Sequence, residues 1–467
     1  MDLCFLKNLQ GRATTRSLVA SITQAVDAGL LSAGEKLPSS REIAQFTGTS
    51  RTTVVRAFDE LIARGYLTGR KGQATYISNT PCEPALLSFE PPMDLKPATF
   101  SGTLPIDLLP IKEWQKCLVH QCSKLTANQF TSDTVQELRA LKQAICGFLR
   151  RTEGILCTPS NVVVFTGTAH AMQSLARLTV NEGMACENKG SAAFELFQKH
   201  GALVSELSID SAGARIDAMG TAAMGLKWLY VTPTGSRPSG ITLSDARRYE
   251  LIEWARMHSG TIIENATGTE FQYAAKSSPS LFAQDRSNSV IYHRSLTGLL
   301  HPLVNLEFMV IPDRLLEKFH ASCPELITPP LIEHLALTDF INDGFLEKHI
   351  RSAWKVLRRR RQMLIFALKQ RFDCKAEIYS SHAGTQIVVR FDNQWTKESI
   401  VKAAEIAGLP IGENVLFCDD DSNRTSEFII DFSAMDEAST EQKIQVLASE
   451  LTQSNIVGVS PQMIFTT

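Results

Sequence analysis

The apolar positions near the amino end predict three short helices. Apolar residues recur every four residues between 18 and 26, as on one face of a helix that stops just afterwards. Ser39–Glu42 is a capping-box sequence that starts a second helix, and Gly48 provides the turn that ends it. A third apolar-periodic segment covers residues 50–65 and predicts a third helix. Two short helices joined by a glycine turn predict a helix-turn-helix.

Two short strand-like segments follow, at residues 66–68 and 75–77, and they flank a basic turn, Arg70-Lys71-Gly72. We therefore expect a winged helix-turn-helix over residues 12–78. In this fold the first turn of the third helix enters the major groove of double-stranded DNA. The residues expected to contact DNA are Arg41, Ser50, Arg51, Thr52, Thr53, Arg56, Lys71 and Gly72.

The long remainder of the chain alternates β-branched apolar runs with helical segments. Residues 79–100 hold five prolines and predict a stiff, extended linker. Beyond it, the body at residues 101–467 has expected strands at 161–167, 226–232, 261–264 and 290–292. This alternation predicts an α/β body with a mostly parallel, doubly wound sheet. A ligand site is then expected at the carboxyl ends of the strands.

Composition and charge add modest constraints. With 467 residues and 44 % hydrophobic content, the chain is large enough for two or three ordinary globular domains. The ten cysteines form no C-x-x-C pair, which favours reduced thiols, and the absence of a signal or membrane-span pattern predicts a cytoplasmic protein without membrane contacts. Residues 12–78 carry nine Lys/Arg against five Asp/Glu, which suits a DNA-binding head on an acidic body but also an ordinary solvated surface.

The motifs of the head resemble the GntR family of bacterial transcription regulators. The resemblance covers about residues 14–78 and rests on Gly34-Glu35-Lys36-Leu37-Pro38-Ser39-Ser40-Arg41-Glu42, Ser50-Arg51-Thr52-Thr53-Val54 and Gly65-Tyr66-Leu67. It implies sequence-specific binding to double-stranded DNA. One departure lies in the wing, where Gln73-Ala74 replaces the family's small residue and glycine after Gly72.

The body resembles a fold-type I aminotransferase, and the combination with this head resembles the MocR subfamily. The carrying segments are Leu104–Pro110 with Trp114, Leu141–Leu149, Thr166–His170, Val231-Thr232-Pro233 with Pro238-Ser239-Gly240, Ile262-Ile263-Glu264 with Glu270-Phe271, and Glu347–Arg351. The resemblance implies a head-to-tail homodimer and a small α+β subdomain at about residues 345–467. It also implies pyridoxal phosphate as the cofactor.

The residues that would hold pyridoxal phosphate are altered. The family's covalent lysine falls on Gly298, the aspartate beside the ring nitrogen on Asn265, and the nearby tyrosine on Thr267. Its phosphate-binding arginine falls on Asn305, and Ser191 stands where an aromatic residue stacks on the ring. We therefore predict no cofactor and no catalysis, and a cleft that binds an unknown small-molecule effector. The residues expected at this cleft are Gly167, Thr168, Asn265, Thr267, Arg294, Ser295, Thr297 and Asn305.

Several alternatives remain open at this stage. One alternative is a regulator or an enzyme that keeps pyridoxal phosphate without the usual lysine, with Lys189 or Lys276 as the substitute. Another alternative is a scaffold that no longer binds DNA. His334 and His349 fit core or surface histidines better than metal ligands, so no metal site is expected. The run Arg358–Arg361 predicts a solvated or ion-paired helix, with a DNA or interdomain contact as the alternative.

Overall fold

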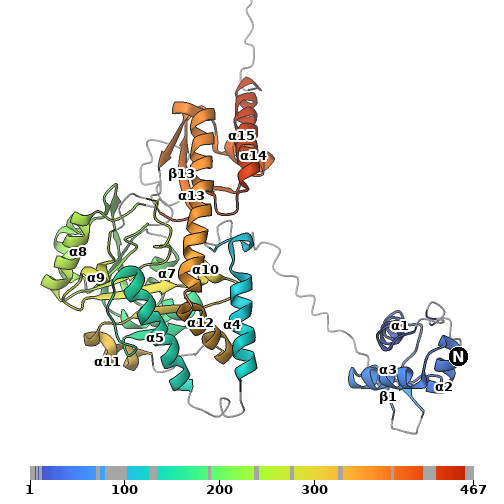
Figure 1. Ribbon diagram of the computed structural model, residues 1–467. Coiled ribbons are helices and arrows are strands. Elements are labelled where there is room, and N and C mark those ends of the chain that lie inside the picture. Colours follow the sequence, from blue (N-terminus) through green and yellow to red (C-terminus); the bar gives the residue numbers. More distant parts are fainter. Residues whose placement is uncertain are drawn as a thin grey trace, which may run out of the picture. The chain divides into compact units, whose positions relative to one another are not determined.

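The computed structural model forms two compact units, Met1–Pro97 and Ala98–Thr467 (Figure 1). The described residues are 6, 9, 13–69, 74–78, 103–125, 134–187, 191–235, 241–273, 278–323, 330–379, 383–413 and 427–457. The expected linker at residues 79–100 and the wing residues Lys71 and Gly72 lie outside these ranges.

The first unit is a winged helix-turn-helix. Its elements are α1 (Thr15–Asp27), α2 (Ser40–Thr47), α3 (Arg51–Ala63), β1 (Leu67–Thr68) and β2 (Tyr76–Ile77). The capping box forms as expected, since the Glu42 amide donates to Ser39 Oγ at 3.3 Å and the Ser39 amide donates to Glu42 Oε2 at 2.7 Å. Gly48 ends α2 at φ 68°, a left-handed conformation that suits glycine. β1 and β2 pair in antiparallel fashion, as the hairpin pattern predicts.

The core of this unit explains the helix phases. The three helices bury Leu18, Ile22, Ile43, Val54 and Leu61 without exposing any part of their side chains. The full set of buried positions in each helix recurs at three- and four-residue intervals, so one side of each helix faces the common core. The opposite side of α3 is left in contact with solvent.

The second unit is built on a seven-stranded sheet. The strands are β3 (Val162–Phe165), β4 (Gly183–Glu187), β5 (Leu203–Leu207), β8 (Trp228–Val231), β9 (Thr261–Asn265), β10 (Val290–Ser295) and β11 (Glu307–Val310). Their order is β3-β11-β10-β9-β8-β4-β5, and β11 runs antiparallel to both of its neighbours while the other pairings are parallel. The mostly parallel α/β fold expected from the sequence is confirmed.

Helices cover both faces of this sheet. They are α4 (Ile111–Lys124), α5 (Thr134–Glu153), α6 (Gly167–Leu178), α7 (Ala192–Lys199), α8 (Asp245–His258), α9 (Leu281–Gln284), α10 (Thr297–Leu300), α11 (Asp313–Ser322) and α12 (Leu331–Asn342). Along β10 the side chains alternate, so Ile291 packs into the core formed with α6, α7 and α11. Tyr292 packs on the opposite face, into the core formed with α5 and α12. This alternation decides which residues of β10 can reach the cleft.

A smaller subdomain follows at the carboxyl end. It contains α13 (Phe345–Phe372), β12 (Ala376–Tyr379), β13 (Gln386–Phe391), α14 (Lys397–Ala407), β14 (Ile411–Glu413), β15 (Glu427–Asp431) and α15 (Glu437–Val457). Its four strands form an antiparallel sheet in the order β12-β13-β15-β14.

The arginine run lies in α13 and makes contacts within the second unit. Arg358 stacks over the ring of Trp354 at 5.1 Å, and Arg359 Nε lies 2.7 Å from a carboxylate oxygen of Glu437. Arg360 pairs with Asp107, which lies before the large sheet in the sequence. The ion-paired helix anticipated from the sequence therefore ties the small subdomain to the rest of its unit.

No helix among the described residues is long and apolar enough to cross a membrane.

Candidate nucleic-acid interface and ligand cleft

The start of α3 is fixed by a side-chain cap. Ser50 Oγ accepts a hydrogen bond from the Thr53 amide at 3.1 Å and lies 2.8 Å from Thr53 Oγ1. Such a cap satisfies amide donors that the first turn leaves unpaired. Ser50 and Thr53, both expected to contact DNA, thus also hold the first turn of the helix. Arg51 Nε lies 3.4 Å from Ser40 Oγ, which brings the guanidinium next to the start of α2.

The exposed side of α3 carries the remaining predicted contacts. Arg51, Thr52 and Arg56 are exposed and lie on the side of the helix away from the core. Val55 lies among them and is 39 % exposed, a residue that the sequence analysis missed. The sequence could have indicated this exposure. Val55 follows the buried Val54 by one residue, so its side chain is rotated by about 100° around the helix axis, away from the core. Arginines suit guanine edges and phosphates, and an exposed valine suits a thymine methyl group.

Arg41 of α2 is also exposed, as a phosphate contact requires. Lys71 and Gly72, the remaining two predicted contacts, belong to the part of the wing outside the described residues. Arg41 therefore lies in the first turn of α2, and Ser50, Arg51, Thr52 and Thr53 lie at the cap and in the first turn of α3, with Arg56 one turn further along.

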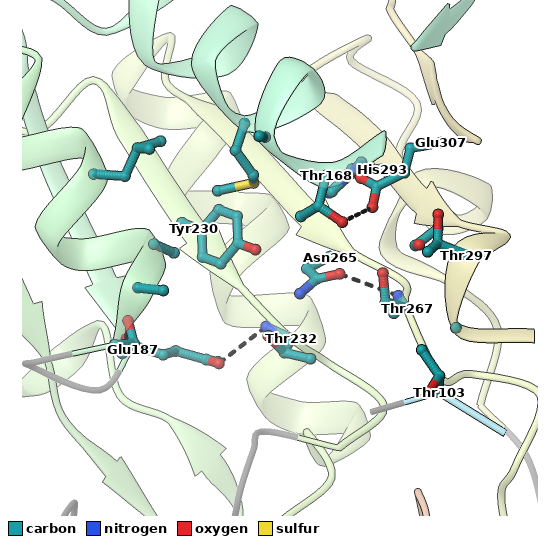
Figure 2. Close-up of a pocket in the computed structure, with 18 residues that line it drawn as sticks. Thr103, Thr168, Glu187, Tyr230, Thr232, Asn265, Thr267, His293, Thr297 and Glu307 are labelled. Atoms are coloured by element: carbon teal, nitrogen blue, oxygen red, sulfur yellow. Dashed lines mark hydrogen bonds and ion pairs between the residues drawn. The ribbon is translucent and has the colours of Figure 1, made fainter. Parts of the chain in front are cut away.

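In the second unit a cavity of about 620 Å³ lies at the carboxyl ends of β4, β8, β9 and β10 and beside the start of α6 (Figure 2). Five of the predicted cleft residues line it: Thr168, Asn265, Thr267, Ser295 and Thr297. Gly298, at the family's lysine position, and Ser191, at its aromatic position, line it as well.

Gly167 and Asn305 meet beside the cavity. Gly167 has φ +76°, and a Cβ at this position would lie 2.8 Å from Asn305 Nδ2. Only glycine suits both the backbone conformation and this approach. Asn305 Oδ1 accepts a hydrogen bond from Thr297 Oγ1 at 3.2 Å, so its amide is held against the cavity wall.

Arg294 was expected in the cleft from the sequence, and this expectation is wrong, because the side chain does not line the cavity. Arg294 follows the alternation of β10 and faces the same side as Tyr292, away from the cavity that His293 and Ser295 line. Its buried guanidinium contacts Glu153, and its Nη2 lies 3.5 Å from Glu270. The positive charge of Arg294 is therefore balanced by carboxylates on the opposite side of the sheet.

The cavity is instead organised around Glu307, which the sequence analysis missed. Glu307 is fully buried at the start of β11, opposite Ser295 of β10. Its carboxylate accepts a hydrogen bond from the Thr168 hydroxyl (Figure 2), and His293 Nε2 lies 2.6 Å from Oε2. Ser295 also hydrogen-bonds to it. One feature of the sequence could have identified Glu307. It follows Asn305 by two residues, so in an extended segment the two side chains lie on the same face of the sheet, toward the cavity.

This network keeps the carboxylate charged. Burial alone would raise the pKa of Glu307, but the hydrogen bonds and charge of His293, together with those of Thr168 and Ser295, lower the pKa below its ordinary value. An ionised carboxylate only accepts hydrogen bonds. His293 must therefore carry its proton on Nε2.

The residues present do not fit pyridoxal phosphate. Gly298 offers no amine, and Asn265 Oδ1 accepts from the Thr267 amide at 3.1 Å rather than bearing a negative charge toward a ring nitrogen. In the place of a phosphate-binding arginine stands the Asn305 amide. Thr168 lies in the first turn of α6, where a helix start would suit a phosphate, and its hydroxyl donates to Glu307.

Comparisons with known proteins agree with both halves of this architecture. Residues 14–77 match the family model "Bacterial regulatory proteins, gntR family". The chain is 26 % identical over 427 residues to the probable rhizopine catabolism regulatory protein MocR of Rhizobium meliloti. The aligned region covers 84 % of this chain and 85 % of that protein. It is also 26 % identical to the uncharacterized HTH-type transcriptional regulator YhdI of Bacillus subtilis, over 88 % of this chain and 90 % of that one.

Among solved structures, kynurenine aminotransferase of Pyrococcus horikoshii matches with a TM-score of 0.65 and 19 % identity, over 76 % of this chain and 90 % of the aminotransferase. At that identity the match establishes the fold of the second unit alone. Residues 14–77 therefore form a GntR-family helix-turn-helix domain, and the second unit has the fold of a fold-type I aminotransferase, which is consistent with a fusion of the MocR type.

Proposed function

We propose that this protein is a sequence-specific, DNA-binding transcription regulator whose aminotransferase domain is non-catalytic and serves dimerisation and effector sensing in the cytoplasm. The observation that carries the proposal is the position of Glu307. Its carboxylate accepts hydrogen bonds from Thr168 and Ser295, whose hydroxyls would otherwise be available to a phosphate. Gly298 offers no amine for a covalent link.

An enzyme of this fold needs its covalent lysine, a charged partner for the ring and a phosphate anchor together. Here all three positions have changed, and one of the anchoring hydroxyls has acquired a permanent partner. A single lost group would suit a specialised enzyme. Coordinated loss of the three supports a binding role for the cleft.

The head supplies the output of such a regulator. Arg51, Thr52 and Arg56 face outward from α3, where they suit base edges and phosphates. A homodimer would present two heads to two half-sites, and a ligand in the cleft would regulate by favouring one arrangement of the heads over another.

The test is cofactor binding by the intact protein. Purified protein is mixed with pyridoxal phosphate, its visible absorbance is recorded before and after borohydride treatment, and peptides are then mapped by mass spectrometry. We expect no protein-bound absorption band and no lysine modified in stoichiometric amount. A band abolished by borohydride and traced to one lysine, such as Lys189 or Lys276, would show that the cofactor is retained.

A further inference from the structure

We infer that the cleft binds an organic cation, an ammonium ion attached to an apolar body, in place of a phosphate-bearing anion. This inference rests on the proposed function, because it names the effector class of the same cleft. Three features of the cavity support it: its charges, a histidine nitrogen without a partner, and its apolar wall.

The described residues that line the cavity carry negative charge and no compensating lysine or arginine. The carboxylate and imidazole side chains among them are Glu187, Glu307 and His293, and Tyr230 adds a phenol. Glu187 and Glu307 come from opposite sides of the cavity, with Asn265 between them in Figure 2. With a neutral imidazole the walls hold two negative charges, and with a protonated one they hold one. Such a cavity attracts cations and repels a dianionic phosphate.

Among the described residues, the buried arginine beside the cavity and the hydroxyls that contact Glu307 do not reverse this preference for a cation. Arg294, the buried guanidinium closest in sequence, faces the other side of the sheet and contacts Glu153 and Glu270. The hydroxyls of Thr168 and Ser295 already donate to Glu307. An anion that entered at Thr168 and Ser295 would therefore have to displace a buried carboxylate from its hydrogen bonds.

His293 supplies an acceptor that suits an ammonium donor. The ring is 3 % exposed, lines the cavity, and uses Nε2 for Glu307. Its Nδ1 has no hydrogen-bond partner among the described residues. The proton shared with Glu307 lies on Nε2, so Nδ1 presents a lone pair whenever the ring is neutral. An entering ammonium ion favours this neutral form over the imidazolium, because its own positive charge takes the place of the ring's charge beside Glu307. A buried lone pair without a partner is stabilised by an N–H donor from a ligand.

The rest of the wall selects the body of the ligand. Met172, Leu196 and Tyr230 line the cavity together with three alanines. A volume of about 620 Å³ lies within the range of roughly 300–1,000 Å³ common for small-molecule sites. An alkyl or aralkyl group of modest size matches this wall.

The experiment is calorimetric titration of the full-length protein with probes that differ in charge. Phenethylammonium and hexylammonium are compared with 3-phenylpropionate, which has a similar body and the opposite charge, and with inorganic phosphate. We expect binding of at least one ammonium ion at about millimolar concentration or below, at least tenfold tighter than the carboxylate or phosphate.

The variant that locates the site is Glu187→Gln. In the native protein, Glu187 Oε2 accepts a hydrogen bond from the Thr232 backbone amide at 3.0 Å. The side-chain oxygen of a glutamine can accept the same hydrogen bond, so the substitution removes the charge and retains the fold. We expect about tenfold weaker ammonium binding, or ~1.4 kcal/mol. Glu195→Gln, on the exposed side of α7, removes the same charge outside the cavity and should leave binding unchanged.

Three outcomes overturn the inference: no binding of either ammonium ion, tighter binding of 3-phenylpropionate or phosphate, or ammonium binding that Glu187→Gln leaves intact. Each of them leaves the proposed regulator role standing, because that role is tested separately by cofactor attachment and DNA binding. A covalent pyridoxal phosphate adduct would instead overturn the non-catalytic assignment itself.

Discussion

At the scale of single residues, Glu307 has the largest structural consequences. A buried carboxylate is costly unless hydrogen bonds and an opposite charge compensate it. Thr168, Ser295 and His293 provide this compensation from two elements that are far apart in the sequence. The stability of the site therefore depends on one carboxylate that no cofactor chemistry requires.

We expect Glu307→Gln to destabilise the second unit by about 3 kcal/mol, because His293 and two hydroxyls lose a shared charged acceptor. Urea unfolding followed by tryptophan fluorescence measures this directly, since all five tryptophans lie in that unit. Glu195→Gln, at an exposed site, is the matched control. Equal midpoints for the two variants would contradict the role given to Glu307.

The same variant should reveal a pH dependence. The folded-state pKa of Glu307 is lowered from its ordinary value of 4.5, so its contribution is fully present above that pH. As the pH falls through the lower folded-state pKa, the carboxylate is protonated in both states and the contribution is lost. The difference in unfolding free energy between the native protein and Glu307→Gln should therefore shrink below about pH 4.5. A difference that grows toward acid pH would require the opposite shift.

A lysine introduced at Gly298 tests whether one side chain separates this cleft from a cofactor site. We expect Gly298→Lys to form no stable adduct with pyridoxal phosphate, because Asn265, Asn305 and Glu307 still fail to hold the ring and the phosphate. Absorbance and borohydride trapping provide the measurement. Gly298→Lys combined with Asn265→Asp, Asn305→Arg and Glu307→Gln should bind more of the cofactor than the single variant does. An equally strong adduct in the single variant would contradict this reading.

At the scale of elements, local signals predicted the head well and the cleft incompletely. The Ser39 capping box and Gly48 act within a few residues, so they mark the limits of α2 directly. The sheet depends on pairing between distant segments. β11 was not predicted as a strand because its residues lie in a long apolar stretch without clear alternation, and only its antiparallel pairing with β10 places Glu307 opposite Ser295.

Arg294 illustrates the same limit. Its position in the sequence put Arg294 near the expected phosphate. The direction of its side chain, however, depends on which residues of β10 face each side of the sheet. His293 and Ser295 face the cavity, so Arg294 cannot. The phase of that strand could be read only once the two cores on either side of the sheet were known.

The start of α3 yields a prediction about DNA. Arg51→Ala should weaken binding of a specific duplex by about 1–3 kcal/mol and reduce the salt dependence, because the exposed arginine at the helix start is lost. Arg64→Ala removes the same charge at the other end of the helix, where Arg64 pairs with Glu60, and serves as the control. Titrations at two or more salt concentrations compare them. Equal losses for both variants would indicate a diffuse charge effect without a docked helix.

At the scale of the whole molecule, the chain couples a small DNA-binding unit to a much larger one that holds the cleft. If the larger unit dimerises, the protein has two heads and its preferred DNA should contain two copies of one short sequence. Selection from random duplexes identifies that sequence, and sedimentation of the free protein gives the number of chains.

We expect a dimer, and about a hundredfold tighter binding to a duplex with two half-sites than to one of equal length with the second scrambled. The gain comes from the second head binding at a high effective concentration. A monomer that binds one unrepeated site with full affinity would contradict the proposed dimer.

If the second unit is non-catalytic, as proposed, the carboxylate of Glu307 also bears on whether it can acquire pyridoxal phosphate chemistry during evolution. A lineage that acquired a lysine at position 298 would gain nothing while Thr168 and Ser295 remain bound to Glu307. A lineage that first lost Glu307 would leave buried donors without an acceptor and would lose stability. Neither of these two single steps would be favoured by natural selection. Under the proposed sensing role, the cleft is therefore free to change its ligand specificity without returning to catalysis.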